Sequence, residues 1–422
     1  MSRSKKSTTI RVEMHIGINS IVVQISNDGY TQFLATGVIC RSESIRTNVR
    51  TRMKITEITT TMLHDPDGYV IQDATIPAID PNTRGKSQLF VHIHTDEGTI
   101  GLGYAPGHRS IQAVIHDSLD GVLVGQDPFM IEKLWKDMYW RVRGIGRKGV
   151  AFQAIAAIDI ALWDLKGKVL NQPIYRLLGP AHETVPIYGS GGWTNYSEGE
   201  LVAEQMGYVE RGIPRVKMKV GKDFGRSERE DIARLAAVRK AVGDDVEIYV
   251  DANNGYYAKQ AIKMSKIFEQ FDVGWFEEPV LADDIPGLAQ ISQATTIPVA
   301  TGEHEYTKYG FRDLLMAGGV DIVQPDVHRV TGITEWMKVA AMADAFNLPV
   351  APHAVSLVHL HCAMATPNLK VVEVLGADEK SQSVWWTEVP PYGDDGTWKP
   401  FADRPGLGLD INPDSLKNNV ID

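Results

Sequence analysis

The chain has 422 residues, a length that indicates one large domain joined to a smaller one rather than a single small core. Its hydrophobic content of 43% and charged content of 23% are those of a soluble globular protein, and its formal net charge of −10 argues against a nucleic-acid partner, which would require a basic surface. No apolar stretch approaches the roughly 20 residues that cross a bilayer, and the two cysteines, Cys40 and Cys362, argue against a disulfide framework and suit a reducing cytoplasm.

The first 52 residues differ in composition from the rest of the chain. They contain eight basic and three acidic residues, a net charge of +5, so the remaining residues carry −15. We favour the interpretation that Met53, which opens an alternating strand-like sequence, is the natural start, and that residues 1–52 form an extension outside the native fold. A transit peptide is an alternative, because the segment is rich in Arg, Ser and Thr. A structured accessory segment is another, because Ile21 to Ile25 could form a strand.

Residues 53–182 are predicted to form a separate α+β capping domain, because strands precede helices there. Residues 53–63 alternate as a strand, and two further apolar runs flank the turn Asp96-Glu97-Gly98 as a hairpin. The polar stretch 73–88 is long enough to be a functional loop. Three helices should follow, at 109–124, 128–142 and 150–169, of which the last is apolar around most of its circumference and should be buried.

Residues 183–385 alternate strictly between apolar strands and amphipathic helices. Such strands belong to a parallel sheet covered by helices, and eight units predict a modified (β/α)8 TIM barrel in the α/β class. A doubly wound open sheet is the alternative, but Gly101-Leu102-Gly103 lies in a hairpin rather than between a strand and a helix, where a nucleotide fingerprint would stand. The candidate strands are 185–190, 215–220, 246–252, 273–277, 298–302, 321–325, 349–352 and 369–374. Residues 386–422, rich in Trp, Pro and Gly, should pack back on the capping domain.

Three acidic residues stand at the ends of successive predicted strands. Asp251, Glu277 and Glu303 are separated by 26 residues each, about the length of one strand–helix unit. A single acidic residue at a strand end is more often a helix cap, as Glu278 beside Glu277 could be, but three at equal spacing are less easily explained in that way. Because barrel strands end at the same face, the three carboxylates should meet and bind a divalent cation such as Mg²⁺.

Two lysines and a His–Asp pair stand at neighbouring strand ends. Lys217 and Lys219 are two residues apart, so both point to the same side of their strand. A Lys-x-Lys sequence is usually a solvated strand edge, but inside a barrel burial and mutual repulsion would lower the pKa of one lysine and make it a base. A lone His353 would more often be a packed or surface histidine, but Asp326 on the preceding strand indicates an oriented imidazole.

Together these groups favour proton abstraction next to a carboxylate. Mg²⁺ would neutralise the substrate carboxylate, while Lys219 and His353 would move the α-proton from either side. Lys217 would polarise the carboxylate, and Glu373, in its protonated form, would hydrogen-bond one of its oxygens. Asn253 is placed to contact a substrate hydroxyl.

The motifs resemble those of the enolase superfamily, within its mandelate-racemase-like branch. The resemblance covers Met53 to about Asn412 and rests on Lys217-x-Lys219, Asp251-x-Asn253, Trp-Phe-Glu277-Glu-Pro, Gly-Glu303, Gln-Pro-Asp326 and Pro-His353. It implies a capping domain followed by a modified barrel, with Lys219 as a base and His353 and Asp326 as the second acid/base. It also implies that Asp251, Glu277 and Glu303 bind the metal, that the loop 73–88 and the segment Gly103–Arg109 close over the substrate, and that the protein is a homo-oligomer.

The sequences around Asp326 and His353 look most like those of talarate/galactarate-type acid-sugar dehydratases. Arg84, His108 and Arg109 would suit a polyhydroxylated acid, unless they are merely solvated. We therefore expect β-elimination of water to a 2-keto-3-deoxy sugar acid, with His353 protonating the departing hydroxyl. The alternatives are a racemase, epimerase or cycloisomerase of the same superfamily and, from a different class, a non-catalytic metal-binding protein.

Overall fold

The computed structural model describes residues 10–16, 19–25, 31–34, 52–67, 72–75, 85–354 and 356–421. The chain divides into two compact units, Met1–Thr51 and Arg52–Asp422. In the first unit, β1 (Ile10–Ile16), β2 (Asn19–Ile25) and β3 (Thr31–Leu34) form an antiparallel sheet. The strand expected at Ile21 to Ile25 lies within β2, and the assignment of residues 1–52 to an extension outside the native fold stays a prediction.

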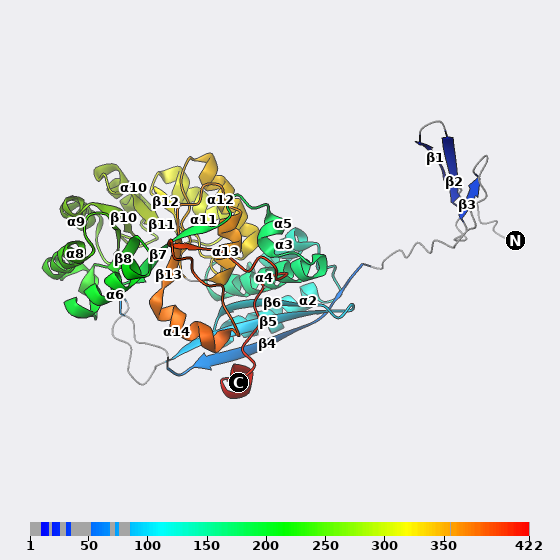
Figure 1. Cartoon of the computed structure of the whole chain (residues 1–422), viewed down its shortest axis with the longest axis horizontal. Helices are drawn as coiled ribbons and strands as arrows, with labels where there is room; N and C mark the ends of the chain where they lie inside the picture. Colours follow the sequence, from blue (N-terminus) through cyan, green and yellow to red (C-terminus); the bar gives the residue numbers. More distant parts are fainter. Residues whose placement is uncertain are drawn as a thin grey trace. The chain divides into compact units, whose positions relative to one another are not determined.

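The second unit begins with an antiparallel sheet and a set of helices (Figure 1). The sheet has the order β4 (Ile55–Asp65), β5 (Lys86–Thr95) and β6 (Ile100–Pro106). The β5–β6 hairpin turns at Gly98, which has a φ of +82° and donates its N–H to the carbonyl of Thr95 at 3.1 Å, so the expected hairpin is confirmed. The helices are α1 (Arg109–Val114), α2 (Asp120–Leu123), α3 (Ile131–Val142), α4 (Val150–Leu170) and α5 (Ile174–Leu178). A π-helical turn, η1 (Ile115–Leu119), interrupts the helix expected at 109–124.

Gly101 and Gly103 let α4 pack directly on β6. A Cβ atom at Gly101 would lie 2.3 Å from the carbonyl oxygen of Ala161, and one at Gly103 would lie 2.0 Å from that of Ala157. Both distances are far inside van der Waals contact, so only glycine fits. The pair of glycines therefore serves the packing of a helix against a sheet, and α4 is buried along most of its length, as expected.

A ring of parallel strands follows. Its hydrogen-bonded order is β12-β11-β10-β9-β8-β7-β13. Val350 closes the ring, because it forms parallel bridges to Val323 of β12 and to Leu369, three residues before β13. The modified (β/α)8 barrel is thus confirmed, but the strand expected at 349–352 is reduced to one bridging residue, Val350, since Pro349 and Pro352 donate no N–H to a ladder. The strands are β7 (Val185–Gly191), β8 (Arg215–Lys219), β9 (Glu247–Asp251), β10 (Val273–Glu277), β11 (Val299–Thr301), β12 (Ile322–Val323) and β13 (Val372–Leu375).

Helices connect these strands and cover the sheet in Figure 1. They are α6 (Glu198–Glu210), α7 (Lys222–Gly225), α8 (Glu228–Val242), α9 (Ala258–Phe268) with the 3₁₀ turn η2 (Glu269–Phe271), α10 (Ile285–Ala294), α11 (Thr307–Ala317), α12 (Ile333–Ala345), α13 (Leu357–Met364) and α14 (Gly376–Trp385).

Buried aromatic side chains fill the interior of the ring. Tyr249 and Trp275 stack with ring centroids 3.4 Å apart, and Tyr188 meets both edge-on. Side chains two residues apart on a strand point to the same side. Asp251 and Glu277, two residues beyond Tyr249 and Trp275, therefore also point inward, above an apolar floor.

The C-terminal segment contacts both the barrel and the antiparallel sheet. β14 (Thr397–Trp398) pairs antiparallel with β7, and Val420, beyond α15 (Ser415–Asn418), bridges Leu63 of β4. Trp386 packs edge-on against Phe90 with a centroid distance of 5.4 Å. In the described part of the chain, no helix combines the length and apolar character needed to span a membrane.

Candidate active site

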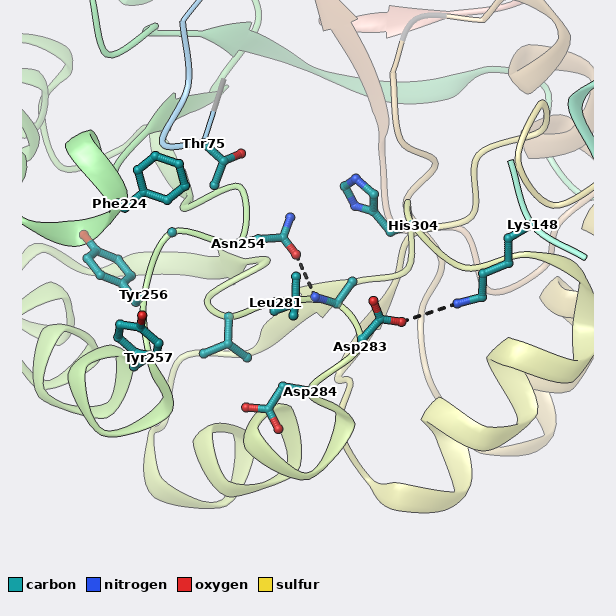
Figure 2. Close-up of a pocket in the computed structure, with 13 residues that line it drawn as sticks. Thr75, Lys148, Phe224, Asn254, Tyr256, Tyr257, Leu281, Asp283, Asp284 and His304 are labelled. Atoms are coloured by element: carbon teal, nitrogen blue, oxygen red, sulfur yellow. Dashed lines mark hydrogen bonds and ion pairs between the residues drawn. The ribbon is translucent and has the colours of Figure 1, made fainter. Parts of the chain in front are cut away.

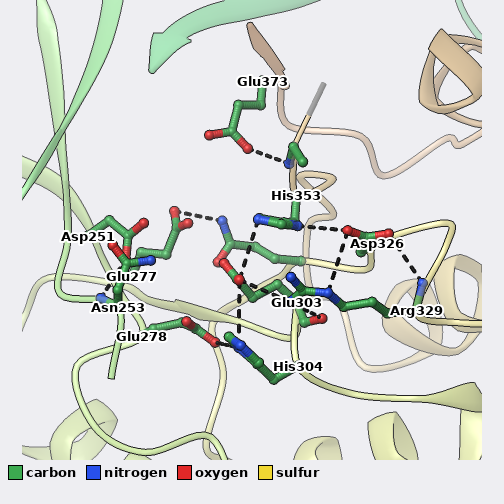
Figure 3. Close-up of polar contacts among 12 residues, drawn as sticks. Asp251, Asn253, Glu277, Glu278, Glu303, His304, Asp326, Arg329, His353 and Glu373 are labelled. Atoms are coloured by element: carbon green, nitrogen blue, oxygen red, sulfur yellow. Dashed lines mark hydrogen bonds and ion pairs between the residues drawn. The ribbon is translucent and has the colours of Figure 1, made fainter. Parts of the chain in front are cut away.

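Charged side chains converge where the parallel strands end (Figure 3). The three carboxylates predicted to bind a metal, Asp251, Glu277 and Glu303, are buried, and each offers an oxygen within 4.8 Å of the others. Burial raises the pKa of Glu277 to about 8, against the attraction of Lys217. Buried carboxylates this close repel one another, so the donor set fits a divalent cation that prefers oxygen ligands.

Both lysines of β8 lie against these carboxylates. Lys217 Nζ lies 2.5 Å from Glu277 Oε1 and 3.1 Å from Glu373 Oε1, and Lys219 Nζ lies 2.5 Å from Asp251 Oδ2. Burial lowers the pKa of each lysine, but the neighbouring carboxylates outweigh it and raise both values. The expectation that burial and repulsion lower the pKa of one lysine is therefore wrong. The Lys-x-Lys sequence alone does not show that carboxylates of other strands lie beside both ammonium groups.

His353 and Asp326 form the expected pair. His353 Nδ1 lies 2.8 Å from Asp326 Oδ2, and His353 Nε2 lies 3.4 Å from Glu303 Oε1. Burial lowers the pKa of His353, but Glu303 and Asp326 raise it to about 9. Asp326 Oδ1 also accepts the backbone N–H of His328 at 2.7 Å, which fixes the carboxylate and hence the imidazole.

The two candidate bases stand on opposite sides of the carboxylate cluster. Lys219 contacts Asp251 at the end of β9, and His353 faces Glu303 beyond β11, with Glu277 of β10 between them. A substrate carbon above Glu277 would thus have one base on each side.

Glu373 and Asn253 also reach this face of the barrel. Glu373 Oε2 accepts the backbone N–H of Ala354 at 2.5 Å, and burial, which raises its pKa, is outweighed by Lys217 and His353, which lower it to about 2. The expectation of a protonated Glu373 is therefore wrong, because two cations stabilise its charge. Asn253 is buried, and its Oδ1 has no hydrogen-bond partner among the described residues.

Of the capping residues predicted to bind substrate, the two that the structure describes are not brought to this cluster. Arg84 lies outside the described residues, and His108 and Arg109, at the start of α1, have exposed side chains. Within the described ranges, neither side chain forms a hydrogen bond or ion pair with the strand-end groups. Tyr104 of β6 does reach the barrel, where its hydroxyl lies 3.1 Å from Ser356 Oγ and its ring lies 5.2 Å from that of His328.

Two side chains around the cluster, Arg329 and Glu278, were not assigned to the site from the sequence. Arg329 Nη1 lies 3.1 Å from Glu303 Oε1, and its spacing of three from Asp326 was the available signal. Glu278 is not a helix cap: it is buried, has a φ of +39°, and accepts hydrogen bonds from Asn254 Nδ2 and His304 Nδ1, each at 2.7 Å.

A cavity of about 670 Å³ opens beside the cluster (Figure 2). His304 lines it and also lies 3.6 Å from Glu303, so this histidine lies next to both the cavity and the carboxylates. Asn254 and Thr75 line the same cavity, as does Lys148, which pairs with Asp283 at 3.7 Å.

Comparisons with known proteins agree with this architecture. The sequence model described as "Enolase C-terminal domain-like" matches residues 200–415, and that of the "Mandelate racemase / muconate lactonizing enzyme, N-terminal domain" matches residues 75–179. Arabinonate dehydratase of Saccharolobus solfataricus is 35% identical over 335 residues, which are 76% of this chain and 88% of the relative. The 3,6-anhydro-α-L-galactonate cycloisomerase of Streptomyces coelicolor is 34% identical over 292 residues, 68% of this chain and 80% of the relative.

A solved structure extends the likeness to three dimensions. L-Talarate/galactarate dehydratase of Salmonella typhimurium LT2, liganded with Mg and L-lyxarohydroxamate, superimposes with a TM-score of 0.80 at 30% identity, covering 92% of this chain and 97% of that one. Fold, strand-end residues and sequence similarity agree, and the chain belongs to the enolase superfamily, in its mandelate racemase/muconate lactonizing enzyme subgroup.

Proposed function

We propose that this enzyme removes the α-proton of a sugar-acid carboxylate with Mg²⁺ and then eliminates water, which makes it an acid-sugar dehydratase. The observation that carries the proposal is the position of Lys219 and the His353–Asp326 pair on opposite sides of three buried carboxylates. Members of the subgroup that this chain resembles include dehydratases and cycloisomerases of sugar acids. Dehydratases and cycloisomerases differ in what happens after the proton is removed, rather than in the removal itself.

Asp251, Glu277 and Glu303 would hold the Mg²⁺. Their buried oxygens fit a hard cation, and the relative from Salmonella was solved with Mg. When bound, the cation would supply electrostatic stabilisation of negative charge on the substrate carboxylate. Lys217, which already lies among carboxylates, would place a positive charge on the same side.

Lys219 and His353 would divide the proton transfers. With Asp251 neutralised by a cation, Lys219 would be held less firmly in its charged form and could accept the C2 proton. His353, whose Nδ1 lies 2.8 Å from Asp326 Oδ2, could in its protonated form protonate the departing C3 hydroxyl. One proton is taken, one is given, and water leaves. The enol product then becomes a 2-keto-3-deoxy sugar acid.

Cycloisomerisation is the second candidate, favoured by the likeness to the Streptomyces cycloisomerase. The same two bases could also run a racemisation or epimerisation. If the protein only binds metal, the loss of Lys219 and His353 should leave its metal binding, its one biochemical property, unchanged. Location in the cytoplasm and assembly into a homo-oligomer stay predictions from sequence.

A panel of aldonates and aldarates, incubated with the enzyme and Mg²⁺, tests the proposal. Semicarbazide detects 2-keto products, and NMR in D₂O detects exchange at C2. A dehydratase gives keto product from at least one acid. Exchange at C2 without keto product from any acid would favour racemisation or cycloisomerisation instead. L-Lyxarohydroxamate, found with Mg in the Salmonella relative, offers a binding probe that needs no turnover.

A further inference from the structure

The turn that follows β7 carries the buried indole of Trp193, which is neither a metal ligand nor one of the two candidate bases. Trp193 is 4% exposed, and its Nε1 has no hydrogen-bond partner among the described residues. Its ring faces the candidate base directly, since Lys219 Nζ lies 5.1 Å from the ring centroid. The turn therefore places an indole ring next to the ammonium group of Lys219.

The turn is held rigidly from two sides. Arg234 of α8 is 3% exposed and donates to the carbonyls of Gly192 and Trp193, each at 2.9 Å, and of Tyr196 at 2.7 Å. Thr194 donates its N–H to the carbonyl of Gln72 at 2.8 Å, which ties the turn to the capping segment. Such fixed placement is what a binding group needs, because its position is set before the ligand arrives.

An unpaired buried N–H is costly, at roughly 1–3 kcal/mol. Three other buried indoles in the described part of the chain avoid that cost: Nε1 of Trp135, Trp275 and Trp398 donates to Thr331, Glu277 and the carbonyl of Pro390, respectively. Nε1 of Trp336 is buried and unpaired like that of Trp193, but its indole lies on α12 within the apolar core. Trp193 instead follows β7 at the strand ends, the face of the barrel that also carries the unpaired Asn253 Oδ1, two residues beyond β9.

We propose that Trp193 binds the substrate through its indole N–H. The donor meets a hydroxyl oxygen of the sugar acid close to the carbon that Lys219 deprotonates, while the ring keeps the lysine ammonium in place. The inference rests on the proposed function, which it deepens: the site selects acids that carry a hydroxyl near the reacting carbon. Removal of that hydroxyl, or of the indole N–H, should cost affinity to a similar extent.

Binding of two hydroxamates with saturating Mg²⁺ tests the proposal by calorimetry. L-Lyxarohydroxamate carries hydroxyls on its carbon chain, and acetohydroxamate carries none on carbon. Trp193→Phe keeps an aromatic ring against Lys219 but lacks the N–H, so it should bind L-lyxarohydroxamate about tenfold more weakly and acetohydroxamate equally well. Trp336→Phe, which removes the other unpaired buried indole N–H, should change neither affinity.

A second measurement on the unaltered protein covers the case in which Trp193→Phe fails to fold. In protein labelled with ¹⁵N-tryptophan, one indole N–H resonance should move on addition of L-lyxarohydroxamate and stay in place with acetohydroxamate. If Trp193→Phe folds, its spectrum identifies that resonance by its loss.

Each outcome decides the matter. Selective weakening by Trp193→Phe supports the proposal. Equal binding of L-lyxarohydroxamate by wild type and Trp193→Phe, or an indole spectrum that does not change, overturns the role of Trp193 and leaves the dehydratase proposal intact. Failure of the wild type with Mg²⁺ to bind either hydroxamate, together with no keto product from any acid of the panel, overturns both.

Discussion

His353 Nδ1 lies 2.8 Å from Asp326 Oδ2, while the opposite ring nitrogen, Nε2, faces Glu303 Oε1 at 3.4 Å. The aspartate orients the imidazole, and the nitrogen that would meet the substrate points toward the carboxylate cluster. The pair joins the end of β12 to the residues after Val350, the two positions of the ring where regular strand structure is shortest.

Asp326→Asn should abolish most activity without unfolding the protein. The asparagine Oδ1 can still accept the N–H of His328, but its amide cannot stabilise a protonated His353. We expect kcat to fall by about 10² to 10⁴ and KM to change little, in analogy to loss of an orienting aspartate in other His–Asp pairs. Steady-state kinetics checks this, with thermal unfolding as the control. A fall confined to KM would contradict the orienting role.

Mg²⁺ should stabilise the protein through Asp251, Glu277 and Glu303. At 100 times its Kd, a ligand that binds only the folded state adds about 2.7 kcal/mol to the free energy of unfolding. Calorimetric unfolding with EDTA and with Mg²⁺ measures the effect. Asp251→Asn should lose it, whereas Glu247→Gln, at the opposite end of β9, should retain it. Equal stabilisation of both variants would place the metal elsewhere.

Asp159 should make stability depend on pH. This buried residue of α4 accepts hydrogen bonds from Thr334 N at 3.0 Å and Thr334 Oγ1 at 2.6 Å. Burial, opposed by these bonds, raises the pKa of Asp159 to about 7. The folded state then binds a proton that the unfolded state, with a pKa of about 4, has lost. The stabilising contribution is therefore present below pH 4 and is lost as the pH rises through 7.

Asp159→Asn isolates that contribution, because every other group titrates in both proteins. The difference in free energy of unfolding between wild type and variant should shift in favour of the variant by about 2–4 kcal/mol between pH 5 and pH 8. Urea unfolding at the two pH values measures it. A difference independent of pH would mean that Asp159 stays ionised throughout.

Gly103→Ala should disrupt the packing of α4 on β6. The new Cβ would lie 2.0 Å from the carbonyl oxygen of Ala157, which is backbone and cannot move aside. We expect a loss of about 3 kcal/mol or more in the free energy of unfolding. Gly121→Ala is the matched control, because nothing lies within 4 Å of its Cβ position and alanine favours a helix. Equal stability of the two variants would contradict the close contact.

The sequence predicted the positions of the strand-end residues better than their states. Even spacing and apolar runs placed Asp251, Glu277 and Glu303 at neighbouring strand ends, because each strand–helix unit of a barrel repeats at a similar length along the sequence. The lowered pKa of one lysine and the protonation of Glu373 were predicted wrongly. Lys219 depends on Asp251, more than 30 residues away in the chain, and Glu373 depends on Lys217, more than 100 residues away.

Other features had only weak local signals. Glu278 looked like a cap, and its contacts with Asn254 and His304 exist only once two βα loops lie side by side. Trp193 was one aromatic residue among many, and its unpaired N–H and its contact with Lys219 require the folded turn. The strand at 349–352 was overestimated because its apolar residues outweighed the two prolines.

Exchange of the C2 hydrogen in D₂O tests the central claim most directly. With Mg²⁺ and the sugar acid that the panel identifies, wild type should incorporate deuterium at C2 or into its product. Lys219→Ala and His353→Asn should each slow proton transfer by about 10² to 10⁴, and the double variant should show none, while all three remain folded. Undiminished exchange by the folded double variant would show that the proton is moved by other groups and would contradict the account.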